Sequence, residues 1–261
     1  MEELKEILRE AFGESSDSEA EDELRELKSS SIGESESIFG AKRSWEQITE
    51  INGLWLCRDF LSSDQQCLLI SAIQAEGWFT EASQNQAMRF GDLPEWAVEL
   101  SNSIRDVILF NNYVQEPPGL ANCGNGHEAT LFPPDLLWRE PLFDQLIANV
   151  YEPGEGICAH VDLMRFEDGI AIVSLESSCV MHFTRVETEV CDVENECGRV
   201  IPSNKVPVLL TPGSLALMWG EARYLWKHEI NRKPGFQEWE GREISQKRRI
   251  SVTLRRLCQN E

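Results

Sequence analysis

The sequence predicts a mainly β domain of the α+β class, with supporting helices on its N-terminal side and an acidic tail before it. Two observations carry this prediction. The second half of the chain holds short apolar runs at even spacing, separated by turn residues, which is typical of a β barrel or sandwich. The first part of the same domain shows apolar residues at helical spacing instead. The length of 261 residues allows one domain with extensions, or at most two.

We place the folded domain at residues 44–261 and expect residues 1–43 to be an acidic tail. Residues 1–13 have the spacing of a short amphipathic helix, which is marginal alone. Residues 14–40 are rich in Ser, Glu and Asp and poor in aromatic residues, which predicts disorder. The tail is either solvated chain without a role or a docking segment for a protein partner.

Charge and cysteine usage limit the functional class. The formal net charge is −21, which argues against broad, non-specific nucleic-acid binding, because such binding depends on Lys and Arg. The eight cysteines include no CxxC pair, and the N-terminus is acidic without an apolar signal segment, which favours reduced thiols. No apolar run approaches a membrane span. We expect a monomer in the cytoplasm or the nucleus, without a membrane partner.

The N-terminal part of the domain is expected to alternate helices and loops. Residues 53–61 predict a strand running into a turn, and residues 62–77 a helix capped by Ser62. Residues 85–94 are interpreted as a polar and aromatic loop before a second helix, 94–110. The long loop that follows is rich in Asn, Gly and Pro, and loops of this length are often functional.

The strands of the β core are expected downstream of that loop. An acidic insertion at 185–205 separates two of them. The predicted strands lie near 143–150, 170–175, 180–183, 206–210, 214–219 and 250–254.

A candidate metal pair, His160-Val-Asp162, lies just past the middle of the chain. Side chains two residues apart point the same way in extended backbone. An imidazole and a carboxylate on one face are two of the three ligands of a 2-His-1-carboxylate Fe(II) site. The pair alone is a weak signal, so the rest of the chain has to complete it.

The third ligand has to come from the remaining histidines, His127, His182 and His228. His127 lies in the Gly- and Asn-rich loop and is interpreted as a surface residue, and His182 lies in an apolar strand and is interpreted as a core residue. His228 follows a loop of polar and aromatic groups at a strand end, where ligands can converge. Elimination therefore favours His228.

A strand near the C-terminus alternates without a break. Its polar stripe is either the solvated face of a half-buried strand or an interior face that binds a dicarboxylate, since Arg pairs with a carboxylate bidentately. Asn149 and Tyr151 also place two hydrogen-bonding side chains on one face. The alternation puts Ile250, Val252 and Leu254 on one face and Arg249, Ser251, Thr253 and Arg255 on the other.

The ordered set of motifs resembles the AlkB-like Fe(II)/2-oxoglutarate dioxygenases, over about residues 53–257. This resemblance implies a double-stranded β-helix, or jelly-roll, core. The motifs in order are Asn149-x-Tyr151, His160-x-Asp162, Arg223-Tyr224 before His228, and Arg249-x5-Arg255.

The resemblance also implies the ligand sets. Fe(II) would be held by His160, Asp162 and His228. 2-Oxoglutarate would be held by Arg249 at its distal carboxylate, with help from Asn149 and Tyr151, and with Arg255 near its proximal end and Asp162.

The chemistry that the resemblance implies needs Fe(II), 2-oxoglutarate and O2, and releases succinate and CO2 while a substrate C–H bond is hydroxylated. A hydroxylated N-methyl group then loses formaldehyde. The expected function is oxidative demethylation or hydroxylation of modified bases in RNA or DNA. The chain looks most like the branch related to the tRNA wobble-uridine hydroxylase, but it has no room for the methyltransferase domain of that enzyme and shows no RNA-recognition motif.

Candidate substrate residues are Met88, Arg89 and Phe90, in the region of the family's substrate lid, together with Met164 and Arg223. Nucleic-acid demethylases of this family often carry an acidic residue where Met164 stands. This departure keeps open a protein-directed oxygenase, which would demethylate or hydroxylate lysine or arginine. A non-catalytic interaction protein is the third alternative.

Overall fold

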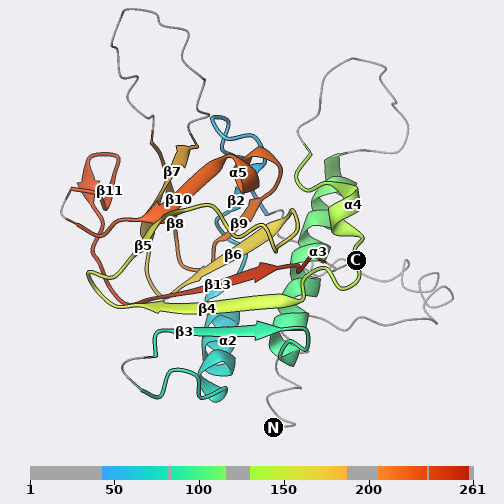
Figure 1. The fold of residues 1–261 in the computed structure, drawn as a ribbon, viewed down its shortest axis with the longest axis horizontal. Coiled ribbons are helices and arrows are strands. Elements are labelled where there is room, and N and C mark those ends of the chain that lie inside the picture. Colours follow the sequence, from blue (N-terminus) through green and yellow to red (C-terminus); the bar gives the residue numbers. More distant parts are fainter. Residues whose placement is uncertain (1–42, 82–83, 116–129, 187–204, 234, 259–261) are drawn as a thin grey trace, which may run out of the picture.

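A computed structural model describes residues 43–81, 84–115, 130–186, 205–233 and 235–258. Their strands form two antiparallel sheets that pack against each other, and two helices cover the larger sheet (Figure 1). The expected N-terminal helix and acidic tail, most of the long loop after the second helix and the acidic insertion lie outside the described residues. Within those residues, no helix is long and apolar enough to cross a bilayer.

The strand order is that of a double-stranded β-helix, which confirms the predicted fold class. Every pairing is antiparallel. The larger sheet runs β1 (Trp45–Gln47), β2 (Leu54–Cys57), β9 (Leu215–Met218), β6 (Ile170–Leu175), β13 (Arg249–Arg255), β4 (Gln145–Tyr151) and β3 (Gln86–Phe90). The smaller sheet runs β5 (Ile157–His160), β10 (Trp226–Ile230), β7 (Cys179–Arg185) and β8 (Val206–Leu210), and a hairpin joins β11 (Glu238–Trp239) to β12 (Arg242–Glu243).

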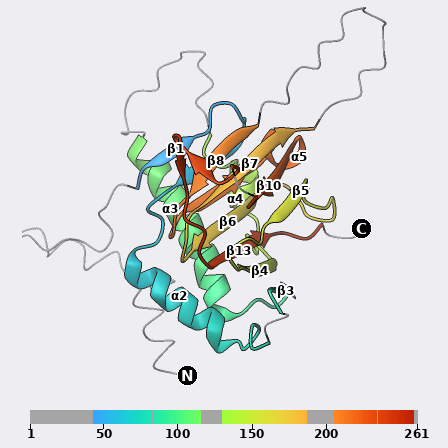
Figure 2. The ribbon, with the colours of Figure 1, turned by 90° about the vertical axis from the view of Figure 1, so that its left-hand side faces the viewer.

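Four helices are described: α2 (Ser63–Ala75), α3 (Glu95–Gln115), α4 (Pro134–Leu137) and α5 (Glu221–Tyr224). The predicted cap of α2 is present. The Ser62 hydroxyl accepts a bond from the Gln65 amide, and the Gln65 side chain accepts one from the Ser62 amide. This capping box satisfies two amide groups that the first helical turn would otherwise leave unpaired. Helices α2 and α3 lie on the outer face of the larger sheet (Figure 2).

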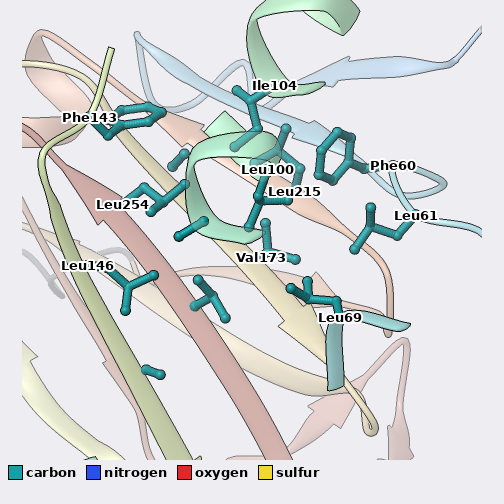
Figure 3. Close-up of a cluster of buried hydrophobic side chains, with 14 of the residues drawn as sticks. Phe60, Leu61, Leu69, Leu100, Ile104, Phe143, Leu146, Val173, Leu215 and Leu254 are labelled. Carbon is teal, nitrogen blue, oxygen red and sulfur yellow. The ribbon is translucent and has the colours of Figure 1, made fainter. Parts of the chain in front are cut away.

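The domain has two apolar cores, one on each side of the larger sheet. The first joins the sheet to α2 and α3, and it includes Leu69, Leu100 and Val173 (Figure 3). The second fills the space between the two sheets. Both faces of β6 and β13 are therefore buried, and these strands are the rigid centre from which the site residues project.

Two predictions about local structure are wrong. Residues 86–90 form the edge strand β3 instead of a loop, because their backbone pairs with β4 from Gln86 opposite Asn149 to Phe90 opposite Gln145. Residues 220–227, expected as a loop before His228, instead form the short helix α5 and the first two residues of β10, which pairs with β5 and β7. Met88 and Phe90 on β3 are partly exposed, although Met88 lines the cavity described below, and this exposure at a sheet edge gives the segment the composition of a loop.

Candidate active site

The strand pairing of the smaller sheet brings the three predicted metal ligands together. His160 on β5 and His228 on β10 are direct partners across the sheet, with ring centroids 4.3 Å apart. Asp162 follows β5 by two residues, so its carboxylate lies on the same side as the His160 ring. One ligand atom from each residue lies within 4.8 Å of the other two. Sequence spacing predicted the pair of His160 and Asp162, elimination and the family resemblance added His228, and β-sheet register brings the three together.

The two oxygens of Asp162 have different surroundings. Its Oδ1 lies 2.5 Å from Nη2 of Arg255, in a pair with little exposure to solvent. Its Oδ2 is buried, lies 3.8 Å from Nε2 of His228, and accepts no hydrogen bond from any described residue. A buried carboxylate oxygen without a donor is costly unless a cation or a donor meets it. Asp162 therefore presents one oxygen that is suited to a metal ion.

The histidines are also prepared to act as ligands. Nδ1 of His160 donates a hydrogen bond to the Cys158 carbonyl at 2.8 Å, which leaves its Nε2 with a free lone pair. Burial lowers the pKa of His228 to about 4, against the opposing effect of Asp162, so its imidazole is neutral at pH 7. Two imidazoles and one carboxylate are the donor set of a non-haem Fe(II) site, and the residues present fit that ion.

Arg223, at the end of α5, holds the backbone that follows β5. Its guanidinium is buried and donates to three carbonyls, those of Asp162 at 3.0 Å, Leu163 at 2.8 Å and Phe166 at 3.1 Å. We call residues 163–168 the rim loop. Arg223 was expected to contact substrate, but it is almost fully buried and faces this backbone, so it positions Asp162 instead.

A cavity of about 290 Å³ opens beside the metal ligands. Ser251, Thr253 and Arg255 line it, so the polar face of β13 is the interior face and not a solvated one. The remaining lining side chains are mostly apolar. The cavity is lined by Gln86, Met88, Ile147, Asn149, Tyr151, Ile157, His160, Val161, Asp162, Leu163, Arg165, Phe166, Ile172, Met181, His228, Ile230, Ser251, Thr253 and Arg255.

Arg249 lies beside this cavity and is fully buried, although it does not form part of the cavity wall. Nη2 donates to the Ser174 hydroxyl at 2.8 Å, whereas Nε and Nη1 have no acceptor among the described residues. Its guanidinium lies 5.5 Å from the ring centroid of Tyr151, which does line the cavity. Burial raises the pKa of Tyr151, so its hydroxyl stays a donor. Buried unpaired donors beside a phenol are suited to a carboxylate.

Sequence reasoning missed Gln86, which supports the same corner of the cavity. Its side-chain amide donates to Oδ1 of Asn149 at 2.8 Å, across the β3–β4 pair. With that oxygen occupied, the Asn149 NH2 group is left to face the cavity. No local pattern in Gln86-Ala-Met-Arg-Phe identifies this role, because the contact depends on the long-range pairing of β3 with β4.

The remaining candidate substrate residues lie on β3 and on the rim loop, and only some of them face the cavity. Met88 lines the cavity, and Phe90 lies on the same face of β3. Arg89 points the other way, with its guanidinium 4.4 Å from the Trp78 ring, so it lies away from the cavity. Met164 is 68% exposed on the rim loop and does not line the cavity.

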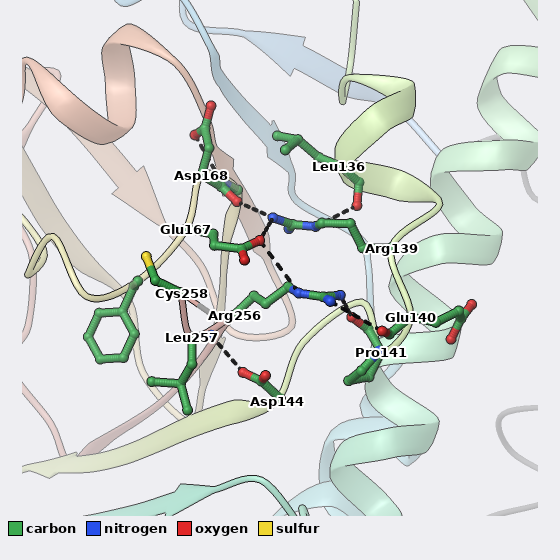
Figure 4. Close-up of polar contacts among 12 residues, drawn as sticks. Leu136, Arg139, Glu140, Pro141, Asp144, Glu167, Asp168, Arg256, Leu257 and Cys258 are labelled. Atoms are coloured by element: carbon green, nitrogen blue, oxygen red, sulfur yellow. Dashed lines mark hydrogen bonds and ion pairs between the residues drawn. The ribbon is translucent and has the colours of Figure 1, made fainter. Parts of the chain in front are cut away.

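A polar network fixes the far end of the rim loop (Figure 4). Arg139 pairs with Glu167 at 3.0 Å and donates to the Asp168 carbonyl at 2.8 Å. The Asp168 carboxylate accepts from the Gly220 amide at 2.9 Å, and Nε of Arg256 lies 3.5 Å from Glu167. The rim loop is thus held from both ends, because Arg223 binds its beginning.

Comparisons with known proteins agree with this geometry. A family model described as the 2OG-Fe(II) oxygenase superfamily matches residues 86–255. The chain is 31% identical over 183 residues to the Xenopus tropicalis protein tRNA (carboxymethyluridine(34)-5-O)-methyltransferase alkbh8, covering 68% of this chain and 25% of the relative. It is 26% identical over 227 residues to the Arabidopsis thaliana alkylated DNA repair protein ALKBH8 homolog, covering 79% of this chain and 59% of the relative.

The solved structure of OsALKBH1 has the same fold, with a TM-score of 0.53, 16% identity and coverage of 82% of this chain and all of that one. This chain spans about a quarter of the length of the Xenopus relative. The family match runs from β3 to the end of β13 and so includes the three predicted metal ligands and every residue that lines the cavity. The chain therefore belongs to the 2OG-Fe(II) oxygenase superfamily, as an AlkB-like dioxygenase that uses Fe(II), 2-oxoglutarate and O2.

Proposed function

We propose that this dioxygenase hydroxylates or oxidatively demethylates a modified base in RNA or DNA. The observation that carries the proposal is the cluster of His160 with the buried Asp162 and His228 at the wall of an open, largely apolar cavity. The names of the relatives refer to tRNA and to alkylated DNA, which favours a nucleic-acid substrate. Family membership and the complete cluster favour an enzyme over a non-catalytic interaction protein.

In this proposal the metal would be held by His160, Asp162 and His228, with Oδ2 of Asp162 as the oxygen left without a donor. Arg255 keeps Oδ1 of Asp162 occupied, so that one oxygen alone is available to the ion. Bound Fe(II), with 2-oxoglutarate and O2, supplies the oxidation of a C–H bond that amino-acid side chains cannot perform. The surrounding apolar side chains exclude water from the substrate carbon.

The cosubstrate would lie along β13 and β4. Arg249 has two unpaired donors for the distal carboxylate, and Tyr151 adds a hydroxyl at the same end. Asn149, held by Gln86, offers its NH2 group to the same molecule. Arg255 stands beside Asp162, next to the end that would approach the metal. These groups orient a dicarboxylate in one direction.

A second candidate is a protein-directed oxygenase. The observation that favours it is Met164, an exposed apolar side chain on the rim where an acidic residue would contact a base. A net charge of −21 also suits a basic peptide better than a polyanion. Lysine or arginine side chains would then be the substrates.

A substrate panel separates the two candidates. Purified protein with Fe(II), 2-oxoglutarate and ascorbate is given methylated RNA and DNA oligonucleotides and, separately, methylated basic peptides. We expect succinate release above background with oligonucleotides, with formaldehyde marking demethylation and its absence marking hydroxylation. The His160→Ala protein serves as the inactive control. Turnover with peptides but not with oligonucleotides would replace the proposal by the second candidate.

A further inference from the structure

The mouth of the cavity carries exposed apolar side chains on a fixed backbone. Leu163 on the rim loop is 61% exposed and Met88 on β3 is 39% exposed, and both line the cavity. Arg223 holds the beginning of the rim loop and the network of Figure 4 holds its end. Exposed apolar residues on an anchored loop beside a cavity indicate a binding surface for a flat apolar group.

Arg165 stands between these two walls and has no anionic partner. It lines the cavity and is exposed, and no described residue pairs with its charge or accepts a hydrogen bond from its side chain. Its guanidinium lies 5.4 Å from the ring centroid of Phe90 and 5.0 Å from that of Phe166. Cation–π attraction to two rings restricts the group, while its N–H donors remain free.

Three other arginines around the site are used within the protein, and Arg249 lies fully buried behind the cavity wall. Arg255 pairs with Asp162, Arg139 pairs with Glu167, and Arg223 binds backbone carbonyls. In a chain with a net charge of −21, an arginine that is held by rings but lacks a carboxylate is a pre-organised anion contact. The planar fork of Arg suits the bidentate binding of phosphate.

We infer that Arg165 contacts the backbone phosphate beside the nucleoside that enters the cavity between Met88 and Leu163. The inference rests on the proposed function and names a substrate contact for it. The two apolar walls suit the faces of a base, and the charged group between them suits the adjoining phosphate. An acidic peptide would satisfy Arg165 but would leave the apolar walls without a matching group.

The test is the salt dependence of binding to a short, fluorescein-labelled single-stranded RNA, followed by anisotropy. The full chain is used with Mn(II) and 2-oxoglutarate in the absence of O2. Each phosphate contact contributes about 0.7 to the slope of log affinity against log salt for single strands. We expect Arg165→Ala to lower the slope by about that amount and to weaken binding several-fold at low salt. Arg165→Lys keeps the charge, so it retains the slope but binds less tightly.

Arg242→Ala is the matched control, because Arg242 is an exposed arginine on β12 that does not line the cavity. It should leave slope and affinity unchanged. A wild-type slope in Arg165→Ala overturns the inference, even when oligonucleotides are turned over and the proposed function stands. Wild-type protein that turns over no oligonucleotide and binds no RNA overturns both. Tighter, Arg165-dependent binding of a polyglutamate peptide than of RNA also overturns the phosphate contact.

Discussion

The side chain of Arg223 is not one of the predicted metal ligands, but it holds the backbone that carries the ligand Asp162. It donates to three backbone carbonyls of the segment after β5. The Leu163 carbonyl also accepts from the Phe166 amide, so the buried carbonyls of Asp162 and Phe166 are the two that depend on Arg223. Removing a donor from buried acceptors costs the desolvation of each acceptor. We expect Arg223→Met, which keeps the apolar stem, to lower the free energy of unfolding by about 3 kcal/mol or more in urea titrations. Arg223→Lys should lose less, and wild-type stability in the Met variant would contradict this role.

Arg249 offers a prediction about cosubstrate binding. Its two unpaired donors are expected to bind a carboxylate with a charge-assisted contact worth roughly 1.5–3 kcal/mol. Arg249→Met should therefore weaken 2-oxoglutarate binding about tenfold to a hundredfold, measured calorimetrically with Mn(II) present. Arg249→Lys should bind with intermediate affinity. Mn(II) affinity measured without 2-oxoglutarate is the control and should not change, and equal losses of both would contradict the assignment.

At the scale of single residues, the sequence could predict which side chains lie together when their spacing along one strand places them on the same face. It could not predict side chains that bind the backbone of a segment far away in the sequence. His160 and Asp162 lie two apart on extended chain, and that spacing alone places them on one side. The contact of Arg223 with Asp162 joins residues 61 positions apart, and a carbonyl acceptor has no side-chain signature. Arg165 was not predicted as a site residue. What sets it apart is that no described residue pairs with its charge, and a sequence pattern cannot show this.

Helix α2 depends on its N-terminal cap. The Ser62 hydroxyl is one half of the capping box that starts the helix. Ser62→Ala should lower the free energy of unfolding by about 1 kcal/mol in urea titrations. Ser63→Ala is the control, because Ser63 is the exposed first residue of the helix and has no role in the box. The prediction fails if the two variants have equal stability.

The pairing of β5 with β10 depends on Gly156, just before β5. A Cβ at this position would lie 1.9 Å from the Ile230 carbonyl oxygen, so the β10 backbone would have to shift. Because this pairing aligns His160 with His228, we expect Gly156→Ala to weaken Mn(II) binding on the order of tenfold.

Cys158→Ala is the control for Gly156→Ala. The Cys158 side chain is exposed, and only its carbonyl oxygen contacts His160. It should bind Mn(II) like the wild type, as followed by electron paramagnetic resonance. Unchanged binding in Gly156→Ala would show that the strands adjust without moving the ligands.

Elements bounded by turn residues were predicted well, and elements at an edge were not. The strands 170–175 and 206–210 agree with β6 and β8 at both ends, because apolar runs and flanking turns define them. Strand β3 is paired on one side only, and its Met88 and Phe90 are exposed. Because an edge strand needs no continuous apolar run, its mixture of polar and aromatic residues is the same as that of a loop. Its pairing with β4 is a long-range contact that local pattern does not reveal.

For the whole molecule, ligand binding and folding should be coupled. A ligand that binds only the folded state at about a hundred times its Kd adds roughly 2.7 kcal/mol of stability. We expect Mn(II) with 2-oxoglutarate to raise Tm by about 5–10 °C in scanning fluorimetry. His228→Ala removes one of the proposed ligands and should show little of this shift. If the wild type and His228→Ala showed the same increase in Tm, the metal would have to bind at a site that does not include His228.

The jelly roll was predictable as a class, because short even strands with turns limit the architecture to a barrel or a sandwich. The family resemblance carried by the ordered motifs then implied the double-stranded β-helix. The order of strands within each sheet did not follow from pattern, since β13 lies between β6 and β4, which are its distant predecessors in sequence. Such neighbours arise from packing of the whole domain.

That position of β13 has a consequence for biosynthesis. β13 is the last strand of the described domain to leave the ribosome, yet it alone joins β4 and β3 to the other four strands of the larger sheet. A nascent chain that stops before it already carries His160, Asp162 and His228, but has neither Arg255 to occupy the second oxygen of Asp162 nor a closed sheet. Iron loading is therefore expected only once β13 has joined the larger sheet.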